Sequence, residues 1–193
     1  MIKKKKKVIR GESEVYTVGY LRSVAWQTLK NARESEKGRL LNCMASVVFS
    51  AFTLEAYCNY LGEKKISFWS IIERNLSVEK KLEIIASQMG IKIDYGCPPF
   101  QSLKFIFKVR DLLAHGKTEI INHEDVQILT DEDMPKLKKA KWQELITFEN
   151  AELYLEETKK MIEYLHEASG LDFNPLYTPE IVGYREYLID EKG

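Results

Sequence analysis

The segment from Arg39 to about Lys65 constrains the fold of this chain more than any other. If the segment is helical, apolar side chains cover most of its circumference instead of a single stripe. Such a helix lies at the centre of a bundle or is buried in a dimer interface. We therefore expect the other helices to pack around it. Its apolar residues are Leu40, Leu41, Met44, Val47, Val48, Ala51, Phe52, Leu54, Tyr57 and Leu61.

Four further segments have the apolar spacing and the end signals of amphipathic helices. Ser77 and Thr147 are suited to cap helix N-termini, and Gly38, Gly90 and Gly170 favour helix termination. The expected helices run from Val15 to about Lys37, from Ser77 to Met89, from Pro99 to a C-terminal glycine at Gly116, and from Thr147 to Ala168.

The remaining segments predict less regular structure. Thr118–Ile121 and Val126–Thr130 flank a polar turn and are typical of a small β-hairpin. Residues 171–193 contain Pro175, Pro179 and Gly183, which favour an irregular extension with a turn of helix at Tyr184–Leu188. We predict a mainly α fold, a four- to five-helix bundle with a hairpin insertion and a C-terminal extension.

Length and composition are typical of one globular domain. The chain has 193 residues, of which 45% are hydrophobic and 30% are charged. We expect a basic N-terminal tail over residues 1–10, a helical domain over 11–170, and an extension over 171–193 that packs on this domain.

The formal net charge of zero conceals an uneven distribution. Lys3–Lys7 supply five of the 29 basic residues, which leaves 24 against 29 acidic residues elsewhere. A terminal lysine run is typical of a solvated tail, although it also attracts phosphates. No signal-peptide apolar region follows it, and no segment has the roughly 18 uninterrupted apolar residues of a membrane span. We expect a cytoplasmic protein with no membrane partner.

The three cysteines predict neither disulfides nor a zinc site. Cys43, Cys58 and Cys97 are an odd number, are widely spaced, and have no metal-binding spacing with histidine. We therefore expect no metal and no cofactor.

The segment Arg110-Asp111-Leu112-Leu113-Ala114-His115-Gly116 has the residues for acid–base chemistry on an anion. Asp111 and His115 lie four positions apart, so a helix places them on one face, where the carboxylate would fix the imidazole tautomer. The other imidazole nitrogen would then serve as acid or base. Arg110 is the side-chain type best suited to bind a phosphate.

Arg110 and His115 are five positions apart and project about 140° from each other on a straight helix. One chain therefore presents them in different directions. Two such helix ends meeting across a two-fold axis would bring the arginine of one subunit beside the histidine of the other. A site built from these residues predicts a homodimer.

This segment resembles the signature of the HEPN superfamily, an arginine, a polar residue, three further residues and a histidine at the end of a helix. Ser50–Tyr60 resembles the second helix of bacterial HEPN proteins. Val78–Leu82, followed by Pro98-Pro99-Phe100, resembles the lead-in to the motif helix. The likeness covers roughly Leu40 to Lys117. The polar residue is most often Asn in the family, whereas here it is Asp111.

The resemblance implies a helical-bundle homodimer with a metal-independent endoribonuclease site, of the kind common in toxin, abortive-infection and other phage-defence systems. His115 would be the acid or base for attack of a ribose 2′-hydroxyl on the adjacent phosphate. Arg110 would stabilise the transition-state charge, with Asp111 beside it. The expected product end is a 2′,3′-cyclic phosphate, and the expected partners are RNA and a cognate antitoxin.

Two alternatives remain open at this stage. Arg110, Asp111 and His115 also suit a helix C-terminus with no catalytic role, in which case the chain is an inactive HEPN-like module that binds a partner protein or a nucleotide-like ligand. The mildly acidic body favours this alternative. Glu55 and Asn59 interrupt the apolar helix as supporting residues, with Glu55 a candidate partner of Arg110, although both also fit a solvated stripe.

Overall fold

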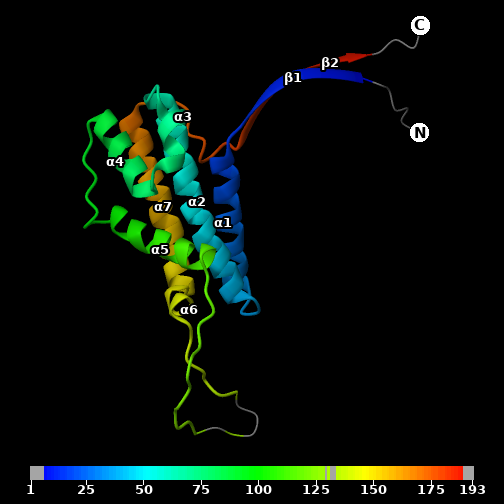
Figure 1. Cartoon of the computed structure of the whole chain (residues 1–193). Helices are drawn as coiled ribbons and strands as arrows, with labels where there is room; N and C mark the ends of the chain where they lie inside the picture. The colour runs from blue at the N-terminus through cyan, green and yellow to red at the C-terminus, as the bar shows by residue number, and fades with distance from the viewer. Residues whose placement is uncertain (1–6, 129, 131–133, 189–193) are drawn as a thin grey trace, which may run out of the picture.

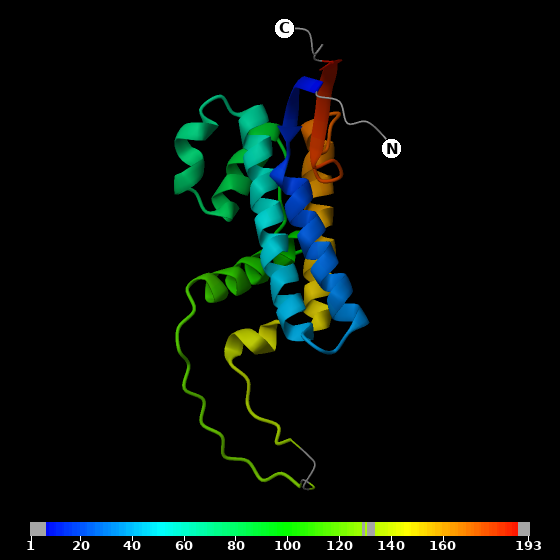
Figure 2. The same cartoon turned by 90° about the vertical axis from the view of Figure 1, so that its right-hand side faces the viewer.

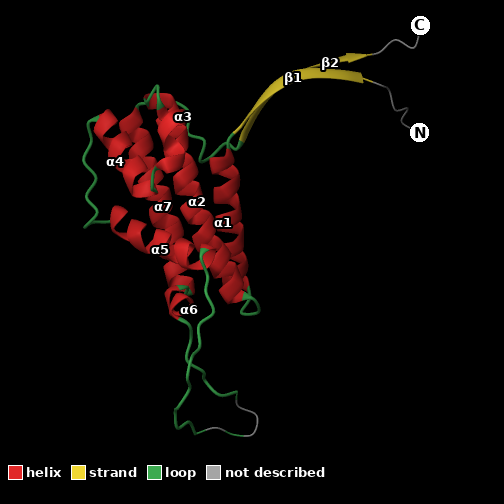
Figure 3. Ribbon diagram, viewed as in Figure 1, coloured by secondary structure: helices red, strands yellow, loops and turns green. Residues whose placement is uncertain are grey.

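The computed structural model describes residues 7–128, 130 and 134–188, with the backbone alone for 184–188. The described residues are mainly helical and include one antiparallel pair of strands (Figures 1 and 3). The elements are β1 (Lys7–Val15), α1 (Thr17–Glu34), α2 (Arg39–Lys65), α3 (Trp69–Ile72), η1 (Glu73–Asn75), α4 (Val78–Met89), η2 (Phe100–Ser102), α5 (Leu103–Ala114), α6 (Lys141–Leu145), α7 (Phe148–Ser169) and β2 (Glu180–Leu188).

Helix α2 is the centre of the bundle, as its apolar circumference predicts. It packs against α1, α4, α5 and α7, and the two views in Figures 1 and 2 show it running between them. From Cys43 to Gly62, α2 contributes buried residues to the core, including Val47, Leu54, Tyr57 and Leu61. The expectation of a mainly helical bundle is confirmed.

The predicted ends at Ser77, Gly90, Thr147 and Gly170 are confirmed, whereas α1 ends at Glu34, before Gly38, which is instead the N-cap residue of α2. The Ser77 hydroxyl accepts a hydrogen bond from the Lys80 amide at 3.3 Å, and the Thr147 hydroxyl accepts one from the Asn150 amide at 3.1 Å. Gly90 and Gly170 end α4 and α7 with φ of 69° and 63°, the left-handed conformation that favours glycine. Local chemistry therefore determines these boundaries.

The predicted hairpin at 118–130 is wrong. The described residues between α5 and α6 form a long loop with no strand (Figure 3). Its two limbs are joined through side chains, because the Gln127 amide both donates to the Lys136 carbonyl and accepts from the Lys136 amide. Ile120, Val126 and Ile128 are almost fully exposed. Since no core surface covers these β-branched residues, their strand propensity is not supported by packing.

The C-terminal extension differs from the prediction of an irregular segment with a helical turn at 184–188. Residues 180–188 instead form β2, which pairs in antiparallel register with β1 from Val15↔Glu180 to Lys7↔Leu188. The resulting ribbon projects away from the helices (Figures 1 and 2). It includes residues 7–10, expected as a tail. Pairing between segments some 170 residues apart leaves no local pattern, and every β1 side chain is exposed.

The beginning of the extension anchors this ribbon on the bundle. Leu176 is buried, the Tyr16 amide donates to the Pro179 carbonyl at 2.7 Å, and the Tyr60 hydroxyl donates to the Phe173 carbonyl at 3.1 Å. A Cβ atom at Gly19 would lie 2.9 Å from the Pro175 carbonyl oxygen. Glycine is thus required in α1 because the extension crosses it closely.

By length and composition alone, α2 could cross a membrane, since an 18-residue window within it has a mean hydropathy of 1.4. The same helix is surrounded by α1, α4, α5 and α7. The central helix of a globular bundle has these same properties.

Replacing Gly62 by alanine should destabilise the fold strongly. An alanine Cβ there would lie 2.0 Å from the ring of Trp69, which is buried between α2 and its neighbours. We expect Gly62→Ala to lower the free energy of unfolding by about 3 kcal/mol, measured by urea denaturation. Gly183→Ala, where nothing lies within 4 Å of the new atom, is the control. Equal stability of the two variants would contradict this packing.

Candidate active site at the end of helix α5

The motif residues lie at the C-terminal end of α5, a helix whose inner face packs in the core. Leu103, Ile106 and Val109 are buried on its inner face. The helix ends at Ala114, and the His115 amide closes the last turn on the Asp111 carbonyl at 2.9 Å. Gly116 follows the cap residue, at the position expected for a C-terminal glycine, although its φ is not positive. His115 itself therefore occupies the cap position of the helix.

Arg110 is held by carboxylates on two elements. Its Nη2 atom lies 3.5 Å from Glu55 Oε2 on α2, and its Nη1 atom lies 2.9 Å from Asp111 Oδ1. The guanidinium also stacks over the Phe107 ring at 5.2 Å. Of the two alternatives for Glu55, a partner of Arg110 or part of a solvated stripe, the structure shows the contact with Arg110.

A second cation, Lys81, binds the same carboxylate and was missed by the sequence analysis. Its Nζ lies 3.1 Å from Glu55 Oε1, and its side chain is only 4% exposed. The signal was available, because Val78, Lys81, Leu82 and Ile85 follow the spacing of one apolar helix face. A lysine on such a face requires a buried partner. Glu55 thus connects α2, α4 and α5.

The expected side-chain contact between Asp111 and His115 is not formed. The Asp111 carboxylate turns to Arg110 instead, because an ion pair with an adjacent guanidinium is within its reach. Among the described residues, none makes a side-chain hydrogen bond to His115, whose imidazole is exposed to solvent. Within the part of one chain that the structure describes, therefore, no carboxylate sets the tautomer of this imidazole.

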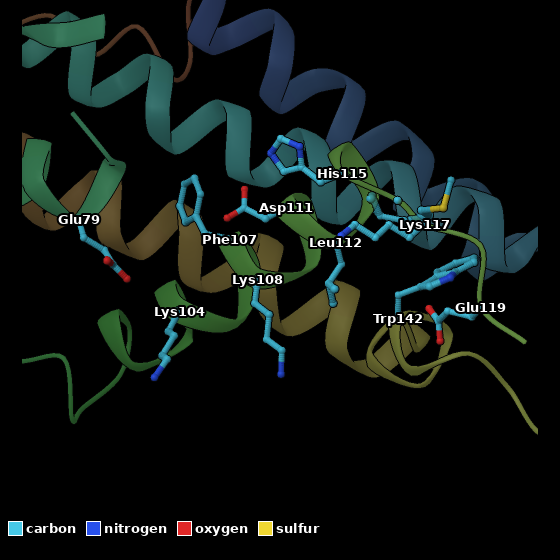
Figure 4. A pocket seen from close by; sticks show the side chains of 13 residues that line it. Glu79, Lys104, Phe107, Lys108, Asp111, Leu112, His115, Lys117, Glu119 and Trp142 are labelled. Atoms are coloured by element: carbon cyan, nitrogen blue, oxygen red, sulfur yellow. The ribbon is translucent and has the colours of Figure 1, made fainter. Parts of the chain in front are cut away.

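Arg110 and His115 face different ways, as their spacing predicts. Arg110 lies against α2 and is half-buried, whereas His115 borders an open groove of about 940 Å³. In Figure 4 Phe107, Asp111 and His115 extend to one side of α5, while Lys104 and Lys108 extend to the other. A single chain does not bring the guanidinium and the imidazole to one point.

Asn59 does not join this site. It lines a separate hollow beside β1 together with Glu14, Tyr16 and Tyr60. Its Oδ1 atom is buried and has no hydrogen-bond partner in the described part of the chain. The structure gives it no contact with Arg110, so of the two supporting residues Glu55 alone reaches the motif.

The groove beside His115 carries both signs of charge. Lys104, Lys108 and Lys117 line it, and so do Glu79, Asp111 and Glu119, while its apolar lining includes Met44, Phe107, Leu112 and Trp142. Within the described ranges, no three His, Cys, Asp or Glu side chains gather as a metal-binding group. The groove therefore combines the exposed imidazole of His115 with lysines that form no ion pair among the described residues, and the guanidinium of Arg110 is held nearby by Glu55 and Asp111.

Comparison with known proteins adds no assignment. No model of a protein family matches the chain, and neither a curated protein nor a solved structure similar to it was found. The arguments for function therefore rest on the residues and their geometry.

Removing Glu55 should leave the Lys81 ammonium buried without its partner. We expect Glu55→Ala to lower the free energy of unfolding by about 2 kcal/mol, somewhat less than for a fully buried pair because the Glu55 side chain is partly exposed. The double variant Glu55→Leu with Lys81→Met should recover most of this loss, since it removes both charges. Denaturation of the two variants measures the effect.

The control is Glu83→Ala, which removes an exposed ion pair with Lys80 on the same helix as Lys81. It should change stability by less than about 1 kcal/mol. A loss as large as that of Glu55→Ala would refute the special role of the buried pair.

Proposed function

We propose that this chain is a metal-independent endoribonuclease of the HEPN type that acts in the cytoplasm as a homodimer. One observation carries the proposal. His115 stands exposed beside an open groove at the end of α5, while Arg110, five positions earlier, is fixed by Glu55 on the central helix. The resemblance of the Arg110–Gly116 segment to the family signature supports the same function, in a toxin or phage-defence setting.

The proposed reaction is an internal transfer of a phosphodiester. The imidazole of His115 accepts the proton of a ribose 2′-hydroxyl, and the 2′-oxygen attacks the adjacent phosphorus. The bond from phosphorus to the 5′-oxygen of the next nucleotide breaks, and that oxygen takes up a proton. The products are a 2′,3′-cyclic phosphate and a free 5′-hydroxyl. Arg110 stabilises the negative charge that develops on the phosphoryl oxygens.

A homodimer resolves the divergence of Arg110 and His115. A two-fold axis near the tips of α5 would place the guanidinium of one subunit beside the imidazole of the other. An apolar surface beside the groove supports such an interface, because Leu41 is 65% exposed and Phe52 is 37% exposed on α2. Met44 of the same helix lines the groove with His115, so this surface adjoins the motif.

A second candidate function is a catalytically inactive module that binds a partner protein, such as an antitoxin, or a nucleotide-like ligand. Two observations favour it. The charge of Arg110 is neutralised by Glu55 and Asp111, and the lysines of the groove are matched by as many carboxylates. A phosphate must therefore compete with Asp111 for the guanidinium.

Cleavage of RNA in the presence of EDTA tests the nuclease directly. We expect the wild type to release fragments with 2′,3′-cyclic phosphate ends. Both His115→Ala and Arg110→Ala should lower the rate by at least about 100-fold, since one removes the acid–base group and the other a charge stabiliser. His123→Ala, an exposed histidine of the long loop, should cleave like the wild type. A wild type without metal-free activity would leave the inactive module as the function.

Mixing the two inactive variants tests whether the site is shared between subunits. A dimer of one Arg110→Ala chain and one His115→Ala chain holds one complete site and one that lacks both groups. If subunits exchange freely, half of the dimers are mixed, so about a quarter of the wild-type activity should return. No recovery, although exchange is verified with differently tagged chains, would place both residues of a site in one subunit.

A further inference from the structure

The groove next to His115 holds a pair of lysines that the motif does not explain. Lys104 and Lys108 lie one turn apart on α5, and both extend from the helix to the same side (Figure 4). In the part of the chain that the structure describes, neither forms an ion pair, and the same holds for Lys117. Like charges four residues apart on a helix destabilise it. Lysines placed in this way suit an anionic ligand.

An aromatic side chain lies on the α6 side of the same groove. Trp142 is partly buried on the core side, and its ring lines the groove near Leu112 and Glu119 (Figure 4). Packing against the core restrains the ring, so that a planar ligand group can stack on its groove-facing side. The groove thus offers cationic groups on α5 and an aromatic surface on α6.

The groove residues follow one another in an order that fits an extended strand. The helical rise separates Lys104 from His115 by about 16 Å along α5. Asp111 and His115 follow the lysine pair along α5 but extend to the other side of the helix, and Leu112 lies between the lysines and Trp142 (Figure 4). The carboxylates of Glu79 and Glu119 lie toward the two ends of the groove in Figure 4. Phosphates are therefore best accommodated along the middle of α5, where the two lysines project.

We propose that this groove is a binding track for single-stranded RNA, in which Lys104 and Lys108 contact phosphates on one side of the cleavage point and Trp142 stacks on an unpaired base on the other. The inference rests on the proposed nuclease function. It makes these three side chains binding residues, distinct from the reacting pair. A base within a duplex is already stacked and paired, so the track selects single strands.

Binding of an uncleavable ligand tests the track separately from catalysis. The probe is a fluorescein-labelled 2′-O-methyl oligouridine of about 12 nucleotides, which lacks the attacking hydroxyl, and the readout is fluorescence anisotropy over a range of salt concentrations. Lys104→Ala with Lys108→Ala should weaken binding about tenfold and reduce the slope of log K against log salt by about 1.4, as expected for two lost phosphate contacts.

Trp142→Leu should weaken binding about tenfold with no change in the salt slope, whereas Trp142→Phe should retain much of the affinity because it keeps an aromatic face. The control variant is Lys159→Ala with Lys160→Ala, which removes two exposed lysines from α7 outside the groove. It should bind like the wild type. The same strand annealed to its complement should bind more weakly than the single strand.

Two results overturn the track: unchanged binding by both the lysine and the tryptophan variants, or equal affinity for the duplex. These results are distinguishable from failure of the nuclease. A wild type that binds the probe through Lys104, Lys108 and Trp142 but does not cleave unmodified RNA supports the track and refutes the nuclease. A wild type that cleaves through His115, with binding unaffected in the groove variants, refutes the track alone.

Discussion

Glu55 is the carboxylate on which the arrangement of three helices depends. It lies on the central helix α2. Its Oε1 atom pairs with the buried Lys81 of α4, and its Oε2 atom pairs with Arg110 of α5. A buried ion pair adds little net stability, but a buried charge without its partner is strongly destabilising. Packing arrangements that separate these charges are therefore disfavoured. Together with the buried apolar face of α5, this side chain fixes Arg110 against α2 and so positions the motif.

The ion pairs of Arg110 also bear on how the motif could function. Arg110 is oriented but neutralised, and His115 is accessible but unsupported, so neither residue alone meets the needs of a phosphoryl-transfer site. In a dimer, a second subunit would place its own Arg110 beside the His115 of the first, and its own His115 beside the Arg110 of the first. In the proposed nuclease, the apolar surface of α2 and the tips of α5 act together, and dimerisation becomes a condition of catalysis.

Features determined by local chemistry could be predicted from the sequence. The central place of α2 and the caps at Ser77 and Thr147 were anticipated, and the pairing of Glu55 with Arg110 was one of two alternatives. The loop at 118–130 was misassigned because strand propensity without a surface to pack on does not form a sheet. Strand β2 was missed because its partner lies at the other end of the chain. Asp111 was assigned to His115, but the adjacent guanidinium competes more effectively for the carboxylate.

The ribbon of β1 and β2 has a consequence for how the molecule can be joined to others. Lys7 and Leu188 pair at its outer end, so the two ends of the folded chain leave the molecule at one pole (Figure 1). The groove of α5 opens elsewhere, among the helices. An attachment made at Lys7 or at Leu188 would therefore immobilise the molecule from the tip of the ribbon and leave the groove free.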